Sequence, residues 1–209
     1  MNVKTIPREV GNYMLEFKAR TNLKLQVTKH QMEILIGCIL GDGYIHPRGQ
    51  IQIAQGIKYL PYLNWKYEEL RSLAYGPPKE VRRFDKRFNK TYVGARFWSR
   101  QYFRPLRKIF YPNGKKIVPK EISKFFTGLS LAVWYMDDGN LYKGRHLKIA
   151  TDGFDEKSRK FLQDLLLSKF GIKSTIHASG KLRISSESLE RFFNITKPFI
   201  HSSMAYKVP

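Results

Sequence analysis

The sequence contains very little cysteine, since Cys38 is the only one among 209 residues. A single thiol cannot form an intramolecular disulfide, and the pattern fits a reducing compartment. The five histidines are scattered without cysteine partners or zinc spacing, and no glycine-rich phosphate loop is present. The composition therefore argues against a disulfide scaffold, a zinc site and a nucleotide-binding loop.

Long hydrophobic runs are also missing. No stretch reaches the roughly 18 apolar residues of a membrane-spanning helix, and no segment resembles a basic amphipathic helix lying on lipid. The first residues have neither a signal-peptide core nor a transit-peptide pattern. We therefore expect no membrane partner and no targeting signal, so that the protein works where it is synthesised.

Acidic residues are scarce relative to basic ones. The chain has 17 Asp and Glu against 38 Lys and Arg, a net charge of +21. A surplus of that size repels itself unless a polyanion is the working partner. Because 42% of the residues are hydrophobic, a folded core is expected. Nucleic acid is thus the predicted partner of a folded protein.

The chain also contains an internal duplication. The segments Leu35–Gly43 (LIGCILGDG) and Leu131–Gly139 (LAVWYMDDG) are both apolar stretches that end in Asp-Gly, and their aspartates lie 96 residues apart. The same offset relates IQIAQ at 51–55 to LKIAT at 147–151. Landmarks repeated in one order indicate two copies of one unit. We predict an N-terminal unit over residues 1–120 and a C-terminal unit over 121–209.

Hydrophobic periodicity predicts the same α-β-β-α-β-β-α order in each unit. The fold class is therefore α+β, a pair of units with two antiparallel sheets. Thr28 to Gln31 resembles a capping box that opens the first helix. The predicted elements then fall at 44–46, 51–54, 60–75, 81–84, 92–98 and 101–110, and in the second unit at 129–136, 141–142, 147–150, 156–170, 174–178, 181–185 and 188–195.

The two Asp-ended helices give the clearest indication of chemistry. Gly37 and Gly41 lie on one helix face, and side chains this small allow a second helix to pack closely. Such packing would bring Asp42 and Asp138 together at the unfavourable end of both helix dipoles. A divalent cation relieves that repulsion, and hard carboxylate oxygens suit Mg²⁺ or Mn²⁺. The predicted chemistry is metal-assisted hydrolysis of a phosphodiester.

These two segments resemble the signature helices of a single-chain LAGLIDADG homing endonuclease, and through the duplication the resemblance covers nearly the whole chain. It implies that the eighth motif position, Asp42 and Asp138, carries the metal carboxylates. It further implies two packed motif helices between pseudo-symmetric halves and sheets that form a DNA-binding saddle. The expected reaction is cleavage of a long double-stranded DNA target, leaving 3′ overhangs. The second motif departs from the first, since Val133 and Asp137 replace Gly37 and Gly41.

Further site residues follow from matching positions in the two units. The resemblance implies one basic residue for each active site, and Lys116 and Lys207 occupy matching places, although by composition alone each is a phosphate contact. Gln55 and Thr151 end equivalent strands and are expected to organise solvent or metal, unless they are plain surface polar residues. Gly41 and Asp137 complete the predicted metal set, with Asp137 favoured as a structural residue.

Basic and amide side chains in and around the predicted strands form the expected reading surface. Arg and Gln can pair with guanine and adenine edges, while Lys mostly meets phosphate. More than half are expected to be phosphate contacts only. The predicted DNA-binding residues are Arg48, Gln50, Gln52, Arg82, Arg83, Lys86, Arg87, Arg96, Arg100, Lys143, Arg145, Lys148, Lys181 and Arg183.

Two other functions fit the same scaffold. One is an RNA maturase that assists intron splicing, with intron RNA as a further partner, and the other is a DNA-binding protein that does not cleave. Retention of both Asp42 and Asp138 favours the enzyme, because a binding protein gains nothing from two repelling carboxylates. We expect a monomer active in intron homing, located in an organelle matrix or stroma or in a prokaryotic cytoplasm.

Overall fold

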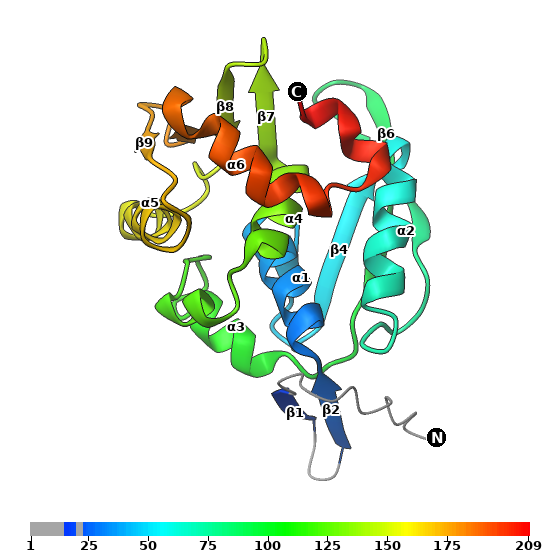
Figure 1. Cartoon of the computed structure of the whole chain (residues 1–209). Helices are drawn as coiled ribbons and strands as arrows, with labels where there is room; N and C mark the ends of the chain where they lie inside the picture. The colour runs from blue at the N-terminus through cyan, green and yellow to red at the C-terminus, as the bar shows by residue number, and fades with distance from the viewer. Residues whose placement is uncertain (1–14, 20–22) are drawn as a thin grey trace. The chain divides into compact units, whose positions relative to one another are not determined.

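A computed structural model describes residues 15–19 and 23–209 (Figure 1). The first half of the chain contains a hairpin followed by helices and strands in the order α-β-β-α-β-β-α. They are β1 Leu15–Ala19, β2 Leu23–Val27, α1 Lys29–Leu40, β3 Tyr44–Ile45, β4 Ile51–Gly56, η1 Ile57–Tyr59, α2 Leu60–Glu69, β5 Lys79–Asp85, β6 Lys90–Trp98 and α3 Arg104–Phe110.

After a short 3-10 helix, the remaining elements repeat the order of helices and strands that begins at α1. They are η2 Lys120–Lys124, α4 Gly128–Asp138, β7 Gly139–Tyr142, β8 His146–Ile149, α5 Glu156–Phe170, β9 Ser174–Ile176, β10 Leu182–Ile184, η3 Ser186–Ser188, α6 Leu189–Thr196, η4 Lys197–Phe199 and η5 Ser202–Lys207. The predicted α-β-β-α-β-β-α order is therefore confirmed in both halves. No described helix has the length and apolar character needed to cross a bilayer.

Two four-stranded antiparallel sheets share one topology. The first has the order β3-β4-β6-β5, and the second has the order β7-β8-β10-β9. In each sheet the first two strands form a hairpin that directly follows a motif helix. The last two strands form a second hairpin, whose later strand lies beside the first hairpin and whose earlier strand lies at the sheet edge. The predicted α+β class with antiparallel sheets is thus confirmed.

Both sheets bury one face and leave the other open. In β4, Ile51 and Ile53 are buried, while Gln52 between them is half-buried. In β8, Leu147 and Ile149 are fully buried, while His146 is exposed and Lys148 is half-buried. This alternation follows from the two-residue repeat of a strand and gives each sheet one polar face.

Local capping interactions fix where the helices begin. The backbone N–H of Gln31 donates to Thr28 Oγ1 at 3.1 Å, and the Thr28 N–H donates to Gln31 Oε1 at 3.2 Å, which confirms the predicted capping box. At α5, Asp155 Oδ1 accepts from the Ser158 N–H at 2.7 Å, and Gly171 ends the helix at φ 64°. The predicted range of α5 agrees with the observed one.

The described residues form two compact units. One contains residues up to 32 together with 43–107, and the other contains 33–42 together with 108–209. Residues 33–42 are most of α1 followed by Gly41 and Asp42, so both motif aspartates belong to the second compact unit. These compact units differ from the two sequence repeats, whose boundary near Lys120 stays a prediction.

Some elements were not predicted or end elsewhere. The β1–β2 hairpin, with Leu15 opposite Val27, was missed although its apolar residues alternate. Helix α2 ends at Glu69 instead of 75, because turns carry the chain from there to Gly76. Helix α3 begins at Arg104 instead of 101. The chain closes in η5, which carries Lys207 and was also missed.

Candidate active site

The two motif helices pack through matched positions of their motifs. A Cβ atom added at Gly37 would lie 2.6 Å from the Ser130 carbonyl oxygen and 2.6 Å from Val133 Cβ. One added at Gly41 would lie 2.5 Å from Asp137 Cβ. Gly37 thus faces Val133, and Gly41 faces Asp137, its counterpart in the other motif. The larger side chains of α4 fill the space that the glycines of α1 leave open, so close packing survives the departure of the second motif.

This packing predicts the effect of Gly37→Ala. The added methyl group cannot move away from the Ser130 backbone, so we expect the free energy of unfolding to fall by about 1–3 kcal/mol. The fall should occur although alanine has a helix propensity about 1 kcal/mol more favourable than glycine. Urea unfolding measures it, and Gly153→Ala is the control because nothing lies within 4 Å of that Cβ position. Unchanged stability in Gly37→Ala would contradict the packing.

An acidic cluster forms where the helices end. Burial raises the pKa of Asp138 to about 7, and the negative charges of Asp42 and Asp137 add to the rise. The positive charges of Lys116 and Lys207 act in the opposite direction. All five predicted residues are therefore close enough to interact electrostatically within the second compact unit. Asp42 is exposed and Asp138 is half-buried, so the cluster is open to solvent and to a ligand.

The two lysines cap the two motifs in corresponding ways. Lys116 Nζ donates to the Gly41 carbonyl oxygen at 3.2 Å, at the end of α1. Lys207 Nζ donates to the carbonyl oxygens of Met136 at 2.6 Å, Gly139 at 2.8 Å and Tyr135 at 3.4 Å, at the end of α4. Each ammonium thus balances the partial negative charge of one helix end. Burial lowers the pKa of Lys116 to about 8, against the pull of Asp138, Asp42 and Asp137.

The cluster fits a hard divalent cation. The negative charges of Asp42 and Asp137 disfavour ionisation of Asp138, a bound positive charge would relieve that repulsion, and Mg²⁺ prefers carboxylate oxygens. No group of three His, Cys, Asp or Glu residues forms a complete cage within residues 15–19 and 23–209. Mg²⁺ commonly takes one or two carboxylates and completes its sphere with water and substrate phosphate. Asp42 and Asp138 would hold the ion, and it would supply charge neutralisation to the reacting phosphate.

The raised pKa of Asp138 predicts a pH-dependent stability of the metal-free protein. With an ordinary value of 3.8 in the unfolded chain and about 7 in the fold, the protonated form is favoured by folding. The associated stability is present below pH 4 and is lost as the pH rises through 7. Asp138→Asn removes the charge, so in EDTA at pH 8 it should raise the free energy of unfolding by roughly 1–2 kcal/mol after allowance for solvent screening.

Thermal unfolding in EDTA at pH 8 and pH 4 measures this effect. The variant should be more stable than the parent at pH 8, and the difference should shrink towards zero at pH 4. Asp164→Asn on the exposed side of α5 is the control, because Asp164 pairs only with solvent-exposed Lys160 at 2.9 Å. A stabilisation of Asp138→Asn that is equally large at both pH values would contradict the electrostatic origin.

Gln55 and Thr151 have unequal surroundings. Gln55 lies in β4 opposite Ala95, in the first compact unit. Strand alternation puts it on the side of Ile51 and Ile53, not on the side of Gln52. Thr151 is buried, and its hydroxyl donates to the Gly180 carbonyl oxygen at 2.6 Å. The hydroxyl of Thr151 therefore uses its proton to stabilise the loop at Gly180. It could organise solvent only by accepting a hydrogen bond.

On the open face of the second sheet, residues that lie opposite one another on neighbouring strands form a polar row. Asn140 lies opposite Lys148, Lys148 opposite Arg183, and Arg183 opposite Thr175. The predicted residues Lys148 and Arg183 therefore share this face. The remaining predicted residues of this half lie at hairpin ends: Lys143, which has φ 50°, with Arg145 between β7 and β8, and Lys181 before β10.

On the first sheet, the predicted residues divide between faces. Gln52 lies on the open face with Arg96 and, by alternation along β5 and β6, Arg83. Arg82 lies opposite Val93, on the other face, and pairs with Glu80 at 2.9 Å. The others lie in turns or beyond strand ends: Arg48, Gln50, Lys86, Arg87, which pairs with Asp85 at 2.8 Å, and Arg100.

Several residues of the open faces were missed by sequence reasoning. Tyr44 lies opposite Gln52 and is 40% exposed, and Trp98 lies on the other side of Gln52. Asn140 and His146 occupy the open face of the second sheet. The available signal was position, because Tyr44 and Asn140 each follow the motif aspartate by two residues and then alternate with buried positions.

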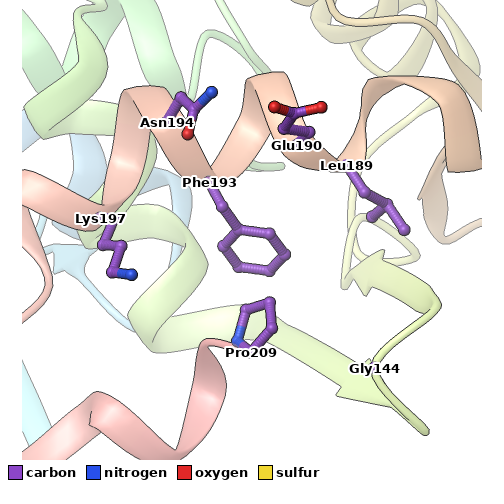
Figure 2. A pocket seen from close by; sticks show the side chains of 7 residues that line it. All are labelled: Gly144, Leu189, Glu190, Phe193, Asn194, Lys197 and Pro209. Carbon is purple, nitrogen blue, oxygen red and sulfur yellow. The ribbon is translucent and has the colours of Figure 1, made fainter.

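A cavity of about 300 Å³ lies elsewhere in the second unit (Figure 2). Side chains of α6 line one side, and the rings of Phe193 and Pro209 face each other across it. None of the predicted catalytic or metal-site residues lines it. The acidic cluster, not this cavity, is therefore the candidate active site.

Paired acidic helix ends, each capped by a lysine, and two polar sheet faces define a nuclease-like nucleic-acid-binding protein. The LAGLIDADG DNA endonuclease family matches residues 32–192, so the chain belongs to this family. A solved structure of the homing endonuclease I-WcaI bound to its DNA recognition sequence matches with a TM-score of 0.76 and 27% identity, over 87% of this chain and 86% of that one. The resemblance identified from the motifs is confirmed.

Curated relatives include proteins of two kinds. The cytochrome b mRNA maturase bI2 of Debaryomyces hansenii is 29% identical, over 90% of this chain and 76% of the relative. The intron-encoded endonuclease ai4 of Dictyostelium discoideum is 36% identical, over 51% of this chain and 70% of the relative. The chain spans about half the length of several other curated relatives that it matches.

Proposed function

We propose that this chain is a site-specific DNA endonuclease that cuts both strands of a long duplex target and leaves 3′ overhangs. The observation that carries the proposal is the acidic cluster of Asp42, Asp137 and Asp138 at the ends of two packed helices. Repelling carboxylates destabilise a protein unless they serve a bound cation, and DNA cleavage is a use for that cation.

In the proposed reaction, the chain's residues position charge around a phosphate. Asp42 and Asp138 hold the divalent ion, Mg²⁺ or Mn²⁺. Lys116 and Lys207, fixed by carbonyl oxygens at the two helix ends, present one ammonium for each strand. An ammonium there stabilises the negative charge that develops on the phosphate oxygens during hydrolysis. The open sheet faces bind the target through phosphates and base edges.

Cleavage of a selected target tests the proposal. Duplexes enriched by binding to the protein in Ca²⁺ are cloned into a plasmid and incubated with Mg²⁺, Mn²⁺, Ca²⁺ or EDTA. In Mg²⁺ or Mn²⁺ we expect linear product with 3′ overhangs. In Ca²⁺ we expect binding with little cutting, and in EDTA we expect no cleavage product. Efficient cutting in excess EDTA would overturn the metal-dependent mechanism.

The maturase relative supports a second candidate, assistance to intron splicing with RNA as the partner. The two activities separate experimentally, because Asp42→Asn should remove DNA cleavage and leave RNA splicing assistance intact. On either proposal the chain works as a monomer in the compartment where it is made, an organelle or a prokaryotic cell. The size of the native protein tests whether it is a monomer, and fractionation of host cells tests its compartment.

A further inference from the structure

Each sheet carries a row of open-face residues that begins two residues after its motif aspartate. In the second sheet the row is Asn140, Lys148, Arg183 and Thr175, here called the cationic row. In the first sheet the row is Tyr44, Gln52 and Trp98, here called the neutral row. Gln52 and Lys148 are separated by the 96-residue offset of the duplication and lie in corresponding strands. The rows are therefore equivalent in position, but one carries two cationic side chains and the other carries none.

The two central residues of the cationic row can only donate hydrogen bonds. Lys148 and Arg183 are adjacent partners across β8 and β10, and neither side chain can accept a hydrogen bond. In the major groove, guanine presents two acceptors, N7 and O6, and Arg or Lys matches this pattern. Adenine and cytosine present an amino donor that a cation cannot satisfy. The row therefore favours guanine.

His146 holds Arg183 in place. Arg183 Nη2 lies 3.3 Å from His146 Nδ1, and both residues are exposed. Since a guanidinium can only donate, Nδ1 accepts in this contact. A guanidinium oriented by a neighbour loses less side-chain entropy when it forms a bidentate pair. His146 is thus a positioning residue for Arg183.

The neutral row combines an amide with aromatic rings. The Tyr44 and Trp98 ring centroids lie 6.4 Å and 6.2 Å from that of His46, so the three rings form one cluster beside Gln52 in which Tyr44 is exposed and Trp98 is half-buried. The guanidiniums of Arg107 and Arg96 lie 5.5 Å and 5.6 Å from the Tyr44 and Trp98 centroids, so the amide of Gln52 is the uncharged hydrogen-bonding group between them. An amide can donate to adenine N7 and accept from its N6 amino group. An apolar ring surface suits the thymine methyl group. The row therefore favours an A·T pair.

We propose that the two rows read different bases, guanine by Lys148 and Arg183 in one half of the target, and an A·T pair by Tyr44, Gln52 and Trp98 in the other half. The inference rests on the proposed function, since it names the base preference of the same DNA-binding faces. It predicts an asymmetric target whose asymmetry is encoded in one row of each sheet. The duplicated fold alone would favour a symmetric one.

Selection from a pool of random-sequence duplex DNA in Ca²⁺ tests the proposal. The parent chain should enrich a sequence with guanine in one half and an A·T pair in the other half. Arg183→Ala should lower the preference for that guanine by roughly 10- to 100-fold and leave the other half unchanged. Gln52→Ala should relax only the A·T position. Lys173→Ala is the matched control, because Lys173 is a basic residue of the same unit that pairs with Glu187 at 3.3 Å.

The role of His146 has its own readout. His146→Asn keeps a hydrogen-bond acceptor and should keep the guanine preference, whereas His146→Leu should weaken it without changing affinity for random DNA. The inference is overturned if Arg183→Ala weakens all sequences equally and the enriched sequence stays the same. If DNA is bound but no sequence is enriched, the proposed site-specific function itself fails.

Discussion

Asp42→Asn and Asp138→Asn should each reduce double-strand cleavage by at least about 1,000-fold, equivalent to roughly 4 kcal/mol of transition-state stabilisation. Each change replaces a charged oxygen of the acidic cluster by an amide of the same shape, so the fold and the sheet faces stay intact. The dissociation constant for the target should change by no more than about tenfold, or 1.4 kcal/mol. Single-turnover cleavage and filter binding of the selected target in Mg²⁺ measure the two quantities.

A matched surface variant keeps this result interpretable. Asp164→Asn changes an exposed carboxylate of the same unit and should leave both cleavage and binding unchanged. For Asp138→Asn, the predicted gain in stability in EDTA provides a second signature, since a residue whose loss stabilises the fold and removes activity is retained for function. Cleavage above one tenth of the parent rate in either variant would contradict the assignment.

The fold was predictable where local sequence signals and the duplication agreed. The Thr28–Gln31 capping box, the apolar periodicity of α1 and the Gly171 end of α5 each reflect an interaction between residues close in sequence. The 96-residue offset then transferred the arrangement to the other half. The β1–β2 hairpin has no counterpart in the duplication, which explains why it escaped.

The site was predictable in its residues but not in its contacts. The motifs predicted Asp42 and Asp138, matched chain positions predicted Lys116 and Lys207, and the structure brings the four together, while their catalytic roles stay predictions. That each ammonium caps the carbonyl oxygens of a motif end depends on segments more than 60 residues apart, which no local pattern encodes. The hydrogen bond from the Thr151 hydroxyl to Gly180 joins residues 29 apart and likewise depends on the tertiary fold.

The departure of the second motif was understandable only in three dimensions. In the sequence, Val133 and Asp137 stand where the first motif has Gly37 and Gly41. The structure shows that each large residue faces the glycine of the other motif at the same motif position. One small and one large partner fill the same space as two medium-sized partners, so the two halves have diverged in a complementary way.

Lys116→Met and Lys207→Met should slow the cutting of opposite DNA strands. The duplicated plan provides one ammonium at each helix end, and our hypothesis is that each stands beside one of the two scissile phosphates. Removing one should slow one strand by roughly 100-fold or more and leave the other close to the parent rate. Nicked DNA of opposite polarity should therefore accumulate, and strand-specific end labelling of the selected target measures it.

The capping role of the lysines requires a separate stability measurement. Lys207→Met removes the charged donor to the carbonyl oxygens of Tyr135, Met136 and Gly139, and Lys116→Met removes the charged donor to the Gly41 carbonyl oxygen, so each variant should be less stable than the parent, by about 1–3 kcal/mol. Cleavage is therefore compared well below the melting temperature of both, with exposed Lys120→Met as control. If both variants are folded and slow both strands equally, the lysines are only caps and phosphate contacts. If each slows a different strand, the ammonium that caps a helix end also acts on the phosphate.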